Sequence, residues 1–385
     1  MSNELPTIGI LGAGQLGKML ALAAHPWDVP IWMLDRSANY PGGVVSTQFV
    51  EGDFKNYDNV LAFGRQVDII TVEIEHVNTE ALQQLKAEGK TVHPDPDVLE
   101  TIKDKGLQKL FYKDHQLPTS PFHLFTNKEE VQQAIQSKTI TIPFVQKSRQ
   151  AGYDGKGVAI IRTEADMEKL LPGGCVIEPL VDIEKEIAVV VARNPSGDIA
   201  HFEPVEMQFH PTANLVELLF CPAALTSKQH NEVIKLAHQV IDTYAVSGLL
   251  AVEFFLTKSG QWLINEVAPR PHNSGHHTID SCVTSQFEQH LRAILNWPLG
   301  DTTEHHPAAM INLLGADGHT GPTIYEGLAK CLALPNCHFH LYGKKQTRPF
   351  RKMGHATALA DNVDTAINHA RKIKKTLKII SNASS

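Results

Sequence analysis

The sequence predicts an α/β fold at its N-terminus, with helices on both faces of a parallel sheet, and an α+β region after it. Three observations support this prediction. Apolar runs alternate with helical patterns through the first hundred residues, strands pair around turns from about residue 140, and a small strand-rich tail begins near residue 301. A chain of 385 residues, at roughly 150 per domain, is long enough for two or three domains.

Four apolar runs define the predicted parallel sheet, and helical or polar segments separate them. The runs are Thr7–Leu11, Ile31–Leu34, Val67–Val72 and Thr91–His93. Parallel strands need a crossover connection, and the helical pattern of Gln15–Ala24 supplies the first one. The breaker cluster of residues 94–97 then marks the end of this domain.

Strand pairs are typical of the next two hundred residues. Residues 142–147 and 157–162 flank a glycine-rich loop, and residues 249–256 and 261–267 form a second hairpin. A helix is expected at about 227–244 and another near the end, at about 363–376. The predicted domains are residues 1–97, residues 98–300 with a lid subdomain at about 118–185, and residues 301–385.

Composition excludes several classes of protein. Lys and Arg number 35 against 42 Asp and Glu, a net charge of -7, and no basic run offers a track for nucleic acid. No stretch approaches 18 apolar residues and no secretory signal is visible, so we expect a cytoplasmic protein that does not enter a membrane. The five cysteines are scattered, and the pairs His276-His277 and His305-His306 lack helical ligand spacing, so neither disulfides nor a zinc site is indicated.

A glycine motif follows the first strand. Residues 12–17 read Gly-Ala-Gly-Gln-Leu-Gly, and Asp35 ends the next strand 18 residues further on, as in dinucleotide-binding proteins. Free N–H groups at a helix start can bind any phosphate or carboxylate, however. The motif therefore leaves dinucleotide binding and other roles open, and Asp35 is either a ribose contact or a solvated strand end.

A second glycine-rich loop, Gln150–Gly157, joins two short strands. Three glycines in six residues allow the main chain to fold over a polyphosphate, Lys156 adds charge, and Lys147 enters the loop from the preceding strand. The loop is neither a Walker loop nor a kinase loop, because a strand rather than a helix follows it. An ordinary glycine hairpin with a solvated lysine is the alternative.

Two carboxylates lie in apolar strands of the second hairpin. If residues 257–260 form an even-length turn, position 253 faces position 264, and Glu253 and Glu266 point diagonally to the same side. Two like charges in apolar surroundings are costly, and a divalent cation would resolve them; oxygen ligands favour Mg²⁺. The alternative is a buried carboxylate paired with Lys or Arg.

Two polar segments complete the pattern. Residues 268–276 follow the second hairpin strand and offer Arg270 as a bidentate fork for an oxyanion and His272 as a proton carrier. Residues 344–352 hold five cations in nine positions of an acidic protein. Beside a nucleotide and a metal, these segments favour a small anion activated by phosphoryl transfer and a substrate that carries a phosphate.

Taken together, these motifs closely resemble the 5-(carboxyamino)imidazole ribonucleotide synthase family of the ATP-grasp superfamily, over nearly the whole chain. The resemblance rests on Gly14-Gln15-Leu16-Gly17, residues 152–157, Glu253 with Asn265-Glu266, residues 268–276, and Tyr342-Gly343-Lys344 with residues 348–355. It implies an ATP-grasp fold: a Rossmann-like N-terminal domain, a two-part ATP-grasp domain and a small C-terminal domain. It also implies ATP-dependent carboxylation of 5-aminoimidazole ribonucleotide by bicarbonate, through carboxyphosphate, with Mg²⁺ (or Mn²⁺) and a homodimer.

The resemblance also implies roles for individual residues. For ATP it implies Lys105, Lys147, Gly152, Tyr153, Asp154, Gly155, Lys156, Gly157, Val158, Glu178, Pro179, Leu180, Val181, Glu186, His210, Asn265 and Glu266. The implied metal ligands are Glu253 and Glu266. The implied catalytic group is Tyr153, Asp154, Arg270, His272 and Lys344, and the implied substrate contacts are Gln15, Leu16, Glu73, Asn273, Ser274 and Arg351.

The chain departs from the family pattern at two places. Phe350 stands where many relatives have glycine, so the main chain is not expected to adopt a positive φ freely there. Lys344 and Lys345 are neighbours, which leaves the functional lysine open by one position. Other hypotheses are an ATP-grasp carboxylase or carboxylate-amine ligase with another acceptor, a nicotinamide-dependent dehydrogenase that uses the first motif, and a non-catalytic nucleotide sensor.

Overall fold

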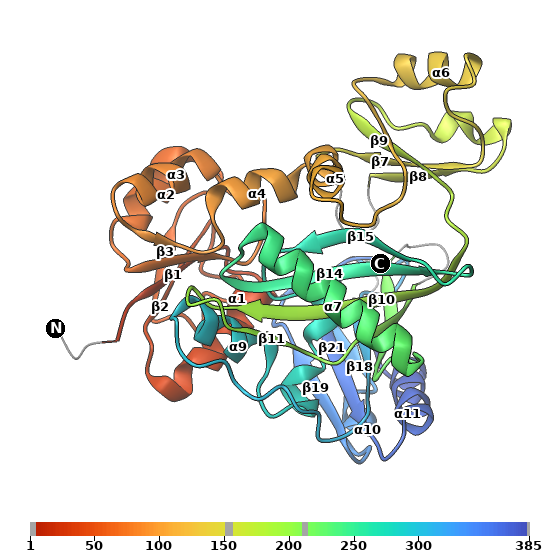
Figure 1. Ribbon diagram of the computed structural model, residues 1–385. Coiled ribbons are helices and arrows are strands. Elements are labelled where there is room, and N and C mark those ends of the chain that lie inside the picture. The colour runs from red at the N-terminus through yellow and green to blue at the C-terminus, as the bar shows by residue number, and fades with distance from the viewer. Residues whose placement is uncertain (1–4, 151–156, 210–214, 383–385) are drawn as a thin grey trace.

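The computed structural model describes residues 5–150, 157–209 and 215–382. In Figure 1 the N-terminal sheet lies on one side, a small subdomain with α6 and β7–β9 projects at the top, and a long central sheet joins the C-terminal strands below. This arrangement confirms the predicted mixed fold. Among the described residues, no helix has the length and apolar character needed to cross a membrane.

The N-terminal sheet is parallel, with the strand order β3-β2-β1-β4-β5. Its strands are β1 (Ile8–Leu11), β2 (Ile31–Asp35), β3 (Gln48–Glu51), β4 (Ile69–Val72) and β5 (Thr91–Val92). The four predicted runs are confirmed as strands. The edge strand β3 was not predicted, because only its two central residues, Phe49 and Val50, are apolar, and none of its four residues is fully buried.

Helices cover both faces of this sheet. They are α1 (Gln15–Ala24), η1 (His25–Trp27), α2 (Tyr57–Gly64), α3 (Thr79–Ala87) and α4 (Pro96–Lys103). The next helix, α5 (Lys105–Asp114), instead buries Tyr112 in the core of the central sheet. On one face α1 packs together with Phe287 and Leu291 of α9 (Gln286–Ile294), a helix from much later in the chain. On the other face α2 and α3 bury Val60, Phe63 and Leu82. The apolar contact with α9 fixes the N-terminal sheet to the central part of the protein.

The projecting subdomain is a four-stranded antiparallel sheet with the order β6-β9-β7-β8. Its elements are β6 (His123–Phe125), α6 (Lys128–Gln136), β7 (Phe144–Ser148), β8 (Val158–Ile161), η2 (Glu164–Lys169) and β9 (Cys175–Pro179). A small apolar core around Phe144 and Ile161 holds it together. The predicted pairing of the strands around the glycine-rich loop is confirmed by β7 and β8.

The central sheet has nine strands, with the order β15-β14-β10-β12-β13-β16-β21-β19 and β11 beside β10. The strands are β10 (Ile183–Arg193), β11 (Ile199–His201), β12 (Val205–Phe209), β13 (Val216–Cys221), β14 (Gly248–Thr257), β15 (Trp262–Ala268), β16 (Ala308–Leu314), β19 (Cys337–Leu341) and β21 (Lys352–Leu359). The pairing of β13 with β16 carries the sheet from the middle of the chain into the C-terminal part without a break.

The remaining elements cover the central sheet and its ends. They are α7 (Ser227–Tyr244), η3 (Asn273–Gly275), α8 (Thr278–Ser281), β17 (Gly321–Pro322), β18 (Ile324–Glu326), α10 (Leu328–Leu332), β20 (Gln346–Thr347), α11 (Val363–Thr376) and β22 (Lys378–Ile380). The α7 helix buries Val233, Ala237 and Val240 against β10 and β14. The α11 helix packs in the same way against β16 and β21 with its own apolar residues. A Thr226 capping box starts α7.

Candidate active site

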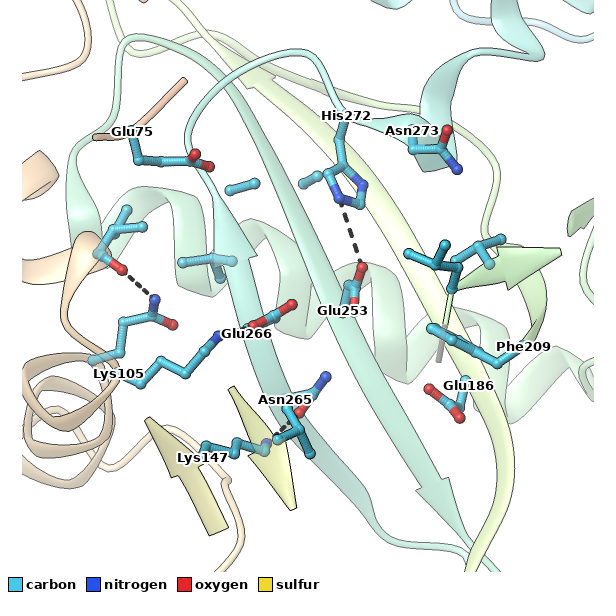
Figure 2. A pocket seen from close by; sticks show the side chains of 18 of the residues that line it. Glu75, Lys105, Lys147, Glu186, Phe209, Glu253, Asn265, Glu266, His272 and Asn273 are labelled. Atoms are coloured by element: carbon cyan, nitrogen blue, oxygen red, sulfur yellow. Dashed lines mark hydrogen bonds and ion pairs between the residues drawn. The ribbon is translucent and has the colours of Figure 1, made fainter. Parts of the chain in front are cut away.

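A cavity of about 580 Å³ lies where the N-terminal sheet, the projecting subdomain and the central sheet meet. Figure 2 shows side chains from all three converging on it. The described residues predicted from the sequence that line the cavity are Gln15, Leu16, Glu73, Lys105, Lys147, Val158, Glu178, Pro179, Leu180, Val181, Glu186, Glu253, Asn265, Glu266, Arg270, His272 and Asn273. Residues predicted from separate segments are therefore brought together around one space.

Glu253 of β14 faces Glu266 of β15 directly, rather than Ile264 as the even-length turn predicted. Two features correct that prediction. Thr257 pairs with Gln261, so the loop has three residues, and Gly260 takes φ +82° in it. A β-bulge then inserts Asn265, after which Glu253 is opposite Glu266. The bulge also turns two consecutive side chains, Asn265 and Glu266, toward the cavity.

The two carboxylates of this hairpin have different partners. Lys105, at the start of α5, forms an ion pair with Glu266 and holds the pKa of Glu266 below its usual range. Burial, with the nearby Glu266 charge, raises the pKa of Glu253, and the imidazole Nε2 of His272 lies 3.7 Å from Glu253 Oε1. Two opposed carboxylates, one of them poorly compensated, are a donor set that fits a divalent cation.

Lys147 and Lys109 share one buried carboxylate. Glu178, at the end of β9, is only 4% exposed; Lys147 Nζ lies 2.7 Å from its Oε2, and Lys109 pairs with its Oε1. Burial alone would raise the pKa of Glu178, but the two lysines keep it lowered. Lys147 also donates to Asn265 Oδ1 at 2.8 Å. This network holds the Lys147 ammonium group between the carboxylate of Glu178 and the amide oxygen of the bulge residue Asn265.

The far end of the cavity is mostly apolar and holds Glu186. Its apolar lining residues are Val145, Val158, Ile160, Leu180, Ile183, Phe209 and Leu215. Burial raises the pKa of Glu186 to about 7. Apolar walls with one carboxyl group suit a flat heterocycle attached to a hydroxylated ring, because the carboxyl can accept hydrogen bonds from hydroxyls.

The opposite end of the cavity carries Arg270, His272 and Asn273. Arg270 Nη2 lies 2.8 Å from Glu75 Oε1, while its buried Nε has no hydrogen-bond partner. Asn273 is also without partners at both amide atoms, although it is buried and lines the cavity. Buried polar atoms left unpaired in this way are expected to be satisfied by a bound polar ligand.

The main-chain N–H groups of the glycine motif are bound by carboxylates of the protein itself. Glu73 accepts hydrogen bonds from the main-chain N–H groups of Gly14 and Gly17, the second at 2.6 Å. Asp35 accepts from Ala13 N at 2.8 Å and is only 6% exposed, so it is neither a ribose contact nor a solvated strand end. A dinucleotide pyrophosphate would need the same N–H groups. The dehydrogenase hypothesis is therefore wrong.

Some predicted residues lie away from the cavity wall. Ser274 Oγ lies 2.9 Å from His272 Nδ1, and the Ser274 N–H donates to the same nitrogen at 3.3 Å, so Ser274 orients the imidazole from behind. Lys344 donates to Lys352 O at 2.7 Å, and Arg351 Nη1 donates to Gln346 O at 2.6 Å. Gly157 is described, with φ +77°. Gly152, Tyr153, Asp154, Gly155, Lys156 and His210 lie outside the described residues.

Four cationic residues were missed: Lys103 and Arg149, which both line the cavity, and Lys352 and Lys109. Lys352 lines the cavity, which none of Lys344, Lys345 and Arg351 does in the described part of the chain. Lys109 is buried, and burial lowers its pKa to about 8. Lys109 follows Lys105 by four positions on one helix, so the i, i+4 spacing was a usable signal. Lys352 had no such signal, because it is one of five cations in a row of nine residues.

Three family models match consecutive parts of the chain. A ribonucleotide synthetase preATP-grasp domain matches residues 5–103, an ATP-grasp domain matches residues 110–287, and a phosphoribosylaminoimidazole carboxylase C-terminal domain matches residues 308–369. The matches follow the three parts of the structure in the same order.

Two curated relatives illustrate the sequence similarity. The N5-carboxyaminoimidazole ribonucleotide synthase of Bacillus subtilis is 34% identical over 361 residues, which cover 93% of this chain and 92% of the relative. The chloroplastic phosphoribosylaminoimidazole carboxylase of Vigna aconitifolia is also 34% identical, over 93% of this chain. The chain spans only 65% of the length of that plant relative and 66% of the Schizosaccharomyces pombe one.

Solved structures agree with this grouping. The N5-carboxyaminoimidazole ribonucleotide synthetase of Thermotoga maritima superimposes with a TM-score of 0.90 at 39% identity, covering 98% of this chain and all of the other. The Aspergillus clavatus enzyme in complex with ADP and 5-aminoimidazole ribonucleotide has a TM-score of 0.88 at 27% identity, covering 97% of this chain and 98% of the other.

Proposed function

The chain belongs to the N5-carboxyaminoimidazole ribonucleotide synthase family, and we propose that it carboxylates 5-aminoimidazole ribonucleotide with bicarbonate and ATP. The products are N5-carboxyaminoimidazole ribonucleotide, ADP and phosphate, in purine biosynthesis. The observation that carries the proposal is the shared cavity, in which Glu253, Glu266, Lys105 and Lys147 stand between an apolar end and Arg270.

ATP takes the half of the cavity formed by the projecting subdomain and the central sheet. The adenine lies along Glu178–Val181 against the apolar lining, and Glu186 accepts hydrogen bonds from the ribose hydroxyls. Lys105 and Lys147 meet the phosphates, where their charges offset the charge that develops on the transferring group. Support comes from the ATP and ADP complexes of Aspergillus clavatus relatives.

A divalent cation completes this arrangement. Glu253 and Glu266 would hold Mg²⁺, or Mn²⁺ in its place, and the ion would neutralise phosphate oxygens during transfer. The opposed carboxylates and the raised pKa of Glu253 support this assignment, because a cation at that point compensates both charges. Lys105 can then leave Glu266 for a phosphate oxygen.

The acceptor end binds the two other substrates. Arg270 presents its planar fork to bicarbonate, and His272, held by Ser274, carries a proton next to it. Gln15, Leu16 and Asn273 contact the ribonucleotide, and Lys344 and Arg351, with the cavity-lining Lys352, form the cationic side that suits its phosphate. The predicted roles of Tyr153 and Asp154 remain part of the proposal.

The reaction proceeds in three steps. A bicarbonate oxygen attacks the γ-phosphorus of ATP, and ADP leaves with the β–γ bridging oxygen. The carboxyphosphate then breaks its C–O bond to give CO₂ and phosphate. The exocyclic amine attacks CO₂ and loses one proton, which His272 can accept. Water would destroy carboxyphosphate, so a closed cavity serves this chemistry.

ADP release from the purified protein tests the proposal. With Mg²⁺, bicarbonate and 5-aminoimidazole ribonucleotide all present, we expect one ADP for each amine carboxylated, and much slower release when the ribonucleotide is omitted. Equal ADP release with a different acceptor, such as an amino acid or biotin, would instead favour another ATP-grasp ligase. We also propose a cytoplasmic location and a homodimer. A monomer in sedimentation experiments would contradict the homodimer but not the activity.

A further inference from the structure

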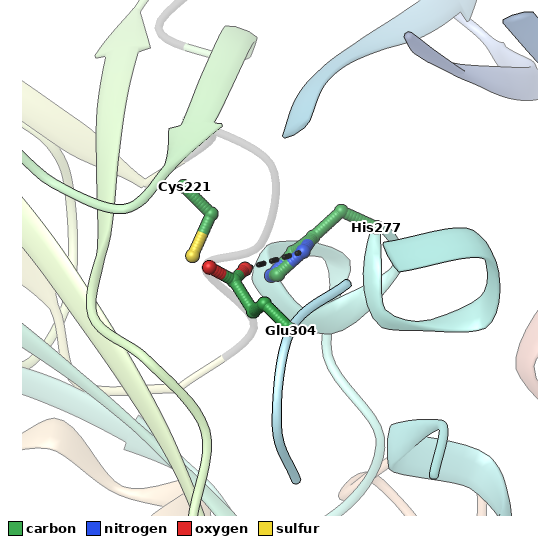
Figure 3. Close-up of side chains that lie close together, drawn as sticks. All are labelled: Cys221, His277 and Glu304. Carbon is green, nitrogen blue, oxygen red and sulfur yellow. Dashed lines mark ion pairs between the residues drawn. The ribbon is translucent and has the colours of Figure 1, made fainter. Parts of the chain in front are cut away.

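Three potential metal ligands meet in the interior, away from the carboxylate pair of β14 and β15. Cys221 ends β13, His277 precedes α8, and Glu304 lies before β16. One ligand atom of each lies within 4.8 Å of the other two, and Figure 3 shows the side chains pointing toward one another. Three segments, separated by 56 and 27 positions in the chain, thus supply one compact set of sulfur, nitrogen and oxygen donors.

The side chains of Cys221 and His277 are buried, and that of Glu304 is half-buried. Cys221 is fully buried and His277 is 1% exposed. Glu304 Oε1 is buried without a hydrogen-bond partner and lies 3.8 Å from His277 Nδ1. An orphaned carboxylate oxygen in the interior costs free energy unless a cation or a donor meets it.

The histidine has a neighbour that orients its ring. Ser281 Oγ donates to His277 O at 3.0 Å and lies 2.9 Å from His277 Nδ1, so the hydroxyl can accept a hydrogen from that nitrogen. In this tautomer Nε2 carries the lone pair and would be the ligand atom, while Nδ1, the nitrogen 3.8 Å from Glu304 Oε1, stays with Ser281. A hydrogen bond to the second ring nitrogen is the usual support for a metal-binding histidine.

We propose that Cys221, His277 and Glu304 bind one borderline-soft divalent cation of the zinc type. The thiolate and the carboxylate together balance its two positive charges, so the occupied site is neutral in a buried setting. Binding releases the Cys221 proton, and the Glu304 proton where that is present. A thiolate ligand disfavours Mg²⁺, which separates this site from the hairpin carboxylates Glu253 and Glu266.

The proposed site would stabilise the acceptor end of the cavity. His277 directly follows His276, which lines the cavity, and the same segment carries His272 and Asn273. A bound ion would join this segment to the end of β13 and to the loop before β16. The ion is thus structural: it fixes the position of residues that contact substrate, and it does not itself enter the proposed reaction.

Cobalt titration of the full chain tests the proposal. In excess Mg²⁺, which occupies the hairpin carboxylates, we expect about one Co²⁺ per chain, a thiolate-to-cobalt absorption band in the near ultraviolet, and displacement of the cobalt by Zn²⁺. The band should disappear in C221S. In H277Q and E304Q the apparent affinity for Co²⁺ should fall at least about tenfold. Zn²⁺ should raise the melting temperature of the wild type but not that of C221S.

Two control variants keep the experiment decisive. Cys282 is buried next to Ser281 but does not belong to the cluster, so C282S should keep the cobalt band. E266Q should also keep it, although that variant loses ATP turnover. A wild type without a thiolate band, or a band that depends on Cys282 or Glu266, would overturn the proposal. Because the wild type is itself measured, misfolding of one variant cannot hide this outcome.

Discussion

Two pairs of carboxylates face the same cavity, and the protein treats them differently. Glu253 and Glu266 are opposite each other on neighbouring strands, with one lysine between them. Glu73 and Glu75 follow β4 two residues apart; Glu73 is bound by the N–H groups of Gly14 and Gly17, and Glu75 is bound by Arg270.

The difference lies in whether a partner can move. Main-chain N–H groups in a glycine loop are fixed, and a Cβ added at Gly14 would come within 2.6 Å of Glu73 Oε1, so the loop and this carboxylate fit one another. Lys105 is a flexible side chain, and in the proposed function it exchanges Glu266 for a phosphate. A carboxylate with fixed partners stabilises the fold, whereas one with a mobile partner, or none, is available to a ligand.

The largest expected effect is on the hairpin pair. Glu266→Gln should lower ATP turnover by at least about a hundredfold, because a cation ligand and a negative charge are lost together, which corresponds to about 3 kcal/mol. The free energy of unfolding should change by less than about 1 kcal/mol, since the Glu266 side chain is 42% exposed to the cavity. Steady-state ADP release and urea denaturation measure the two quantities.

A matched control exists on the same sheet. Glu206 of β12 also pairs with a lysine, Lys185 at 2.8 Å, but does not line the cavity, so Glu206→Gln should leave turnover within about twofold. Turnover of Glu266→Gln that matched this control would remove the metal assignment from the hairpin.

The reverse result is expected for the other pair. Glu73→Gln should lower the free energy of unfolding by about 1–3 kcal/mol, because an amide can accept from only one of the two loop N–H groups without placing its own NH₂ against the other. Glu51 ends a strand of the same sheet and is exposed, so Glu51→Gln is the control, with a change below about 0.5 kcal/mol. Unchanged stability with weakened ribonucleotide binding would show that substrate contact, as predicted from sequence, is the main role of Glu73.

Glu186 extends the comparison to pH. Its pKa is raised from 4.5 to about 7 by burial, so the folded protein holds this proton more tightly than the unfolded chain. The resulting contribution to the free energy of unfolding is fully present below about pH 4.5 and is lost as the pH rises through about 7. After allowing for partial exposure, the contribution is about 2 kcal/mol. Glu186→Gln should remove this part of the pH dependence.

Thermal unfolding between about pH 5 and pH 8 measures that change. Glu184 lies on the same strand but is exposed, so Glu184→Gln should keep the wild-type pH profile. If both variants gave the wild-type profile, Glu186 would not be protonated in the folded protein, and burial would not govern its charge.

Much of the fold was predictable because hydrophobic periodicity is a local property. The runs that became β1, β2 and β4 are apolar over several consecutive residues, as buried parallel strands are. The edge strand β3 has no such run, and its pairing with β2 depends on the tertiary structure. Local patterns also found the hairpin of β14 and β15.

The register of that hairpin was not predictable, because a distant segment determines it. Ile264 N donates to Pro118 O, and Ile264 O accepts from Thr119 Oγ1, more than 140 residues away in the chain. These contacts occupy the main chain where the bulge begins. The two acids therefore share a face for a different reason from the one predicted. The ligand of the first glycine motif was hidden in the same way, since Glu73 lies 56 residues after Gly17.

The smallest expected effect concerns Phe350, where the structure corrects a prediction. The sequence led us to expect that a phenylalanine would not freely adopt a positive φ, yet Phe350 takes φ +60° and donates from its N–H to Gly315 O at 2.9 Å. The left-handed conformation costs a non-glycine residue about 1–2 kcal/mol. Phe350→Gly should therefore be more stable than Phe350→Ala by about 1 kcal/mol in urea denaturation.

Comparing the glycine and alanine variants separates the effect of the main-chain conformation on stability from the effect of the phenyl ring. Both variants lose the 40%-exposed phenyl ring, so its contacts cancel and only the backbone preference remains. Equal stability would mean that the loop relaxes to a negative φ once the ring is gone. In that case the ring itself imposes the left-handed turn just before Arg351 and the cavity-lining Lys352, and the shape of the cationic segment would depend on this side chain.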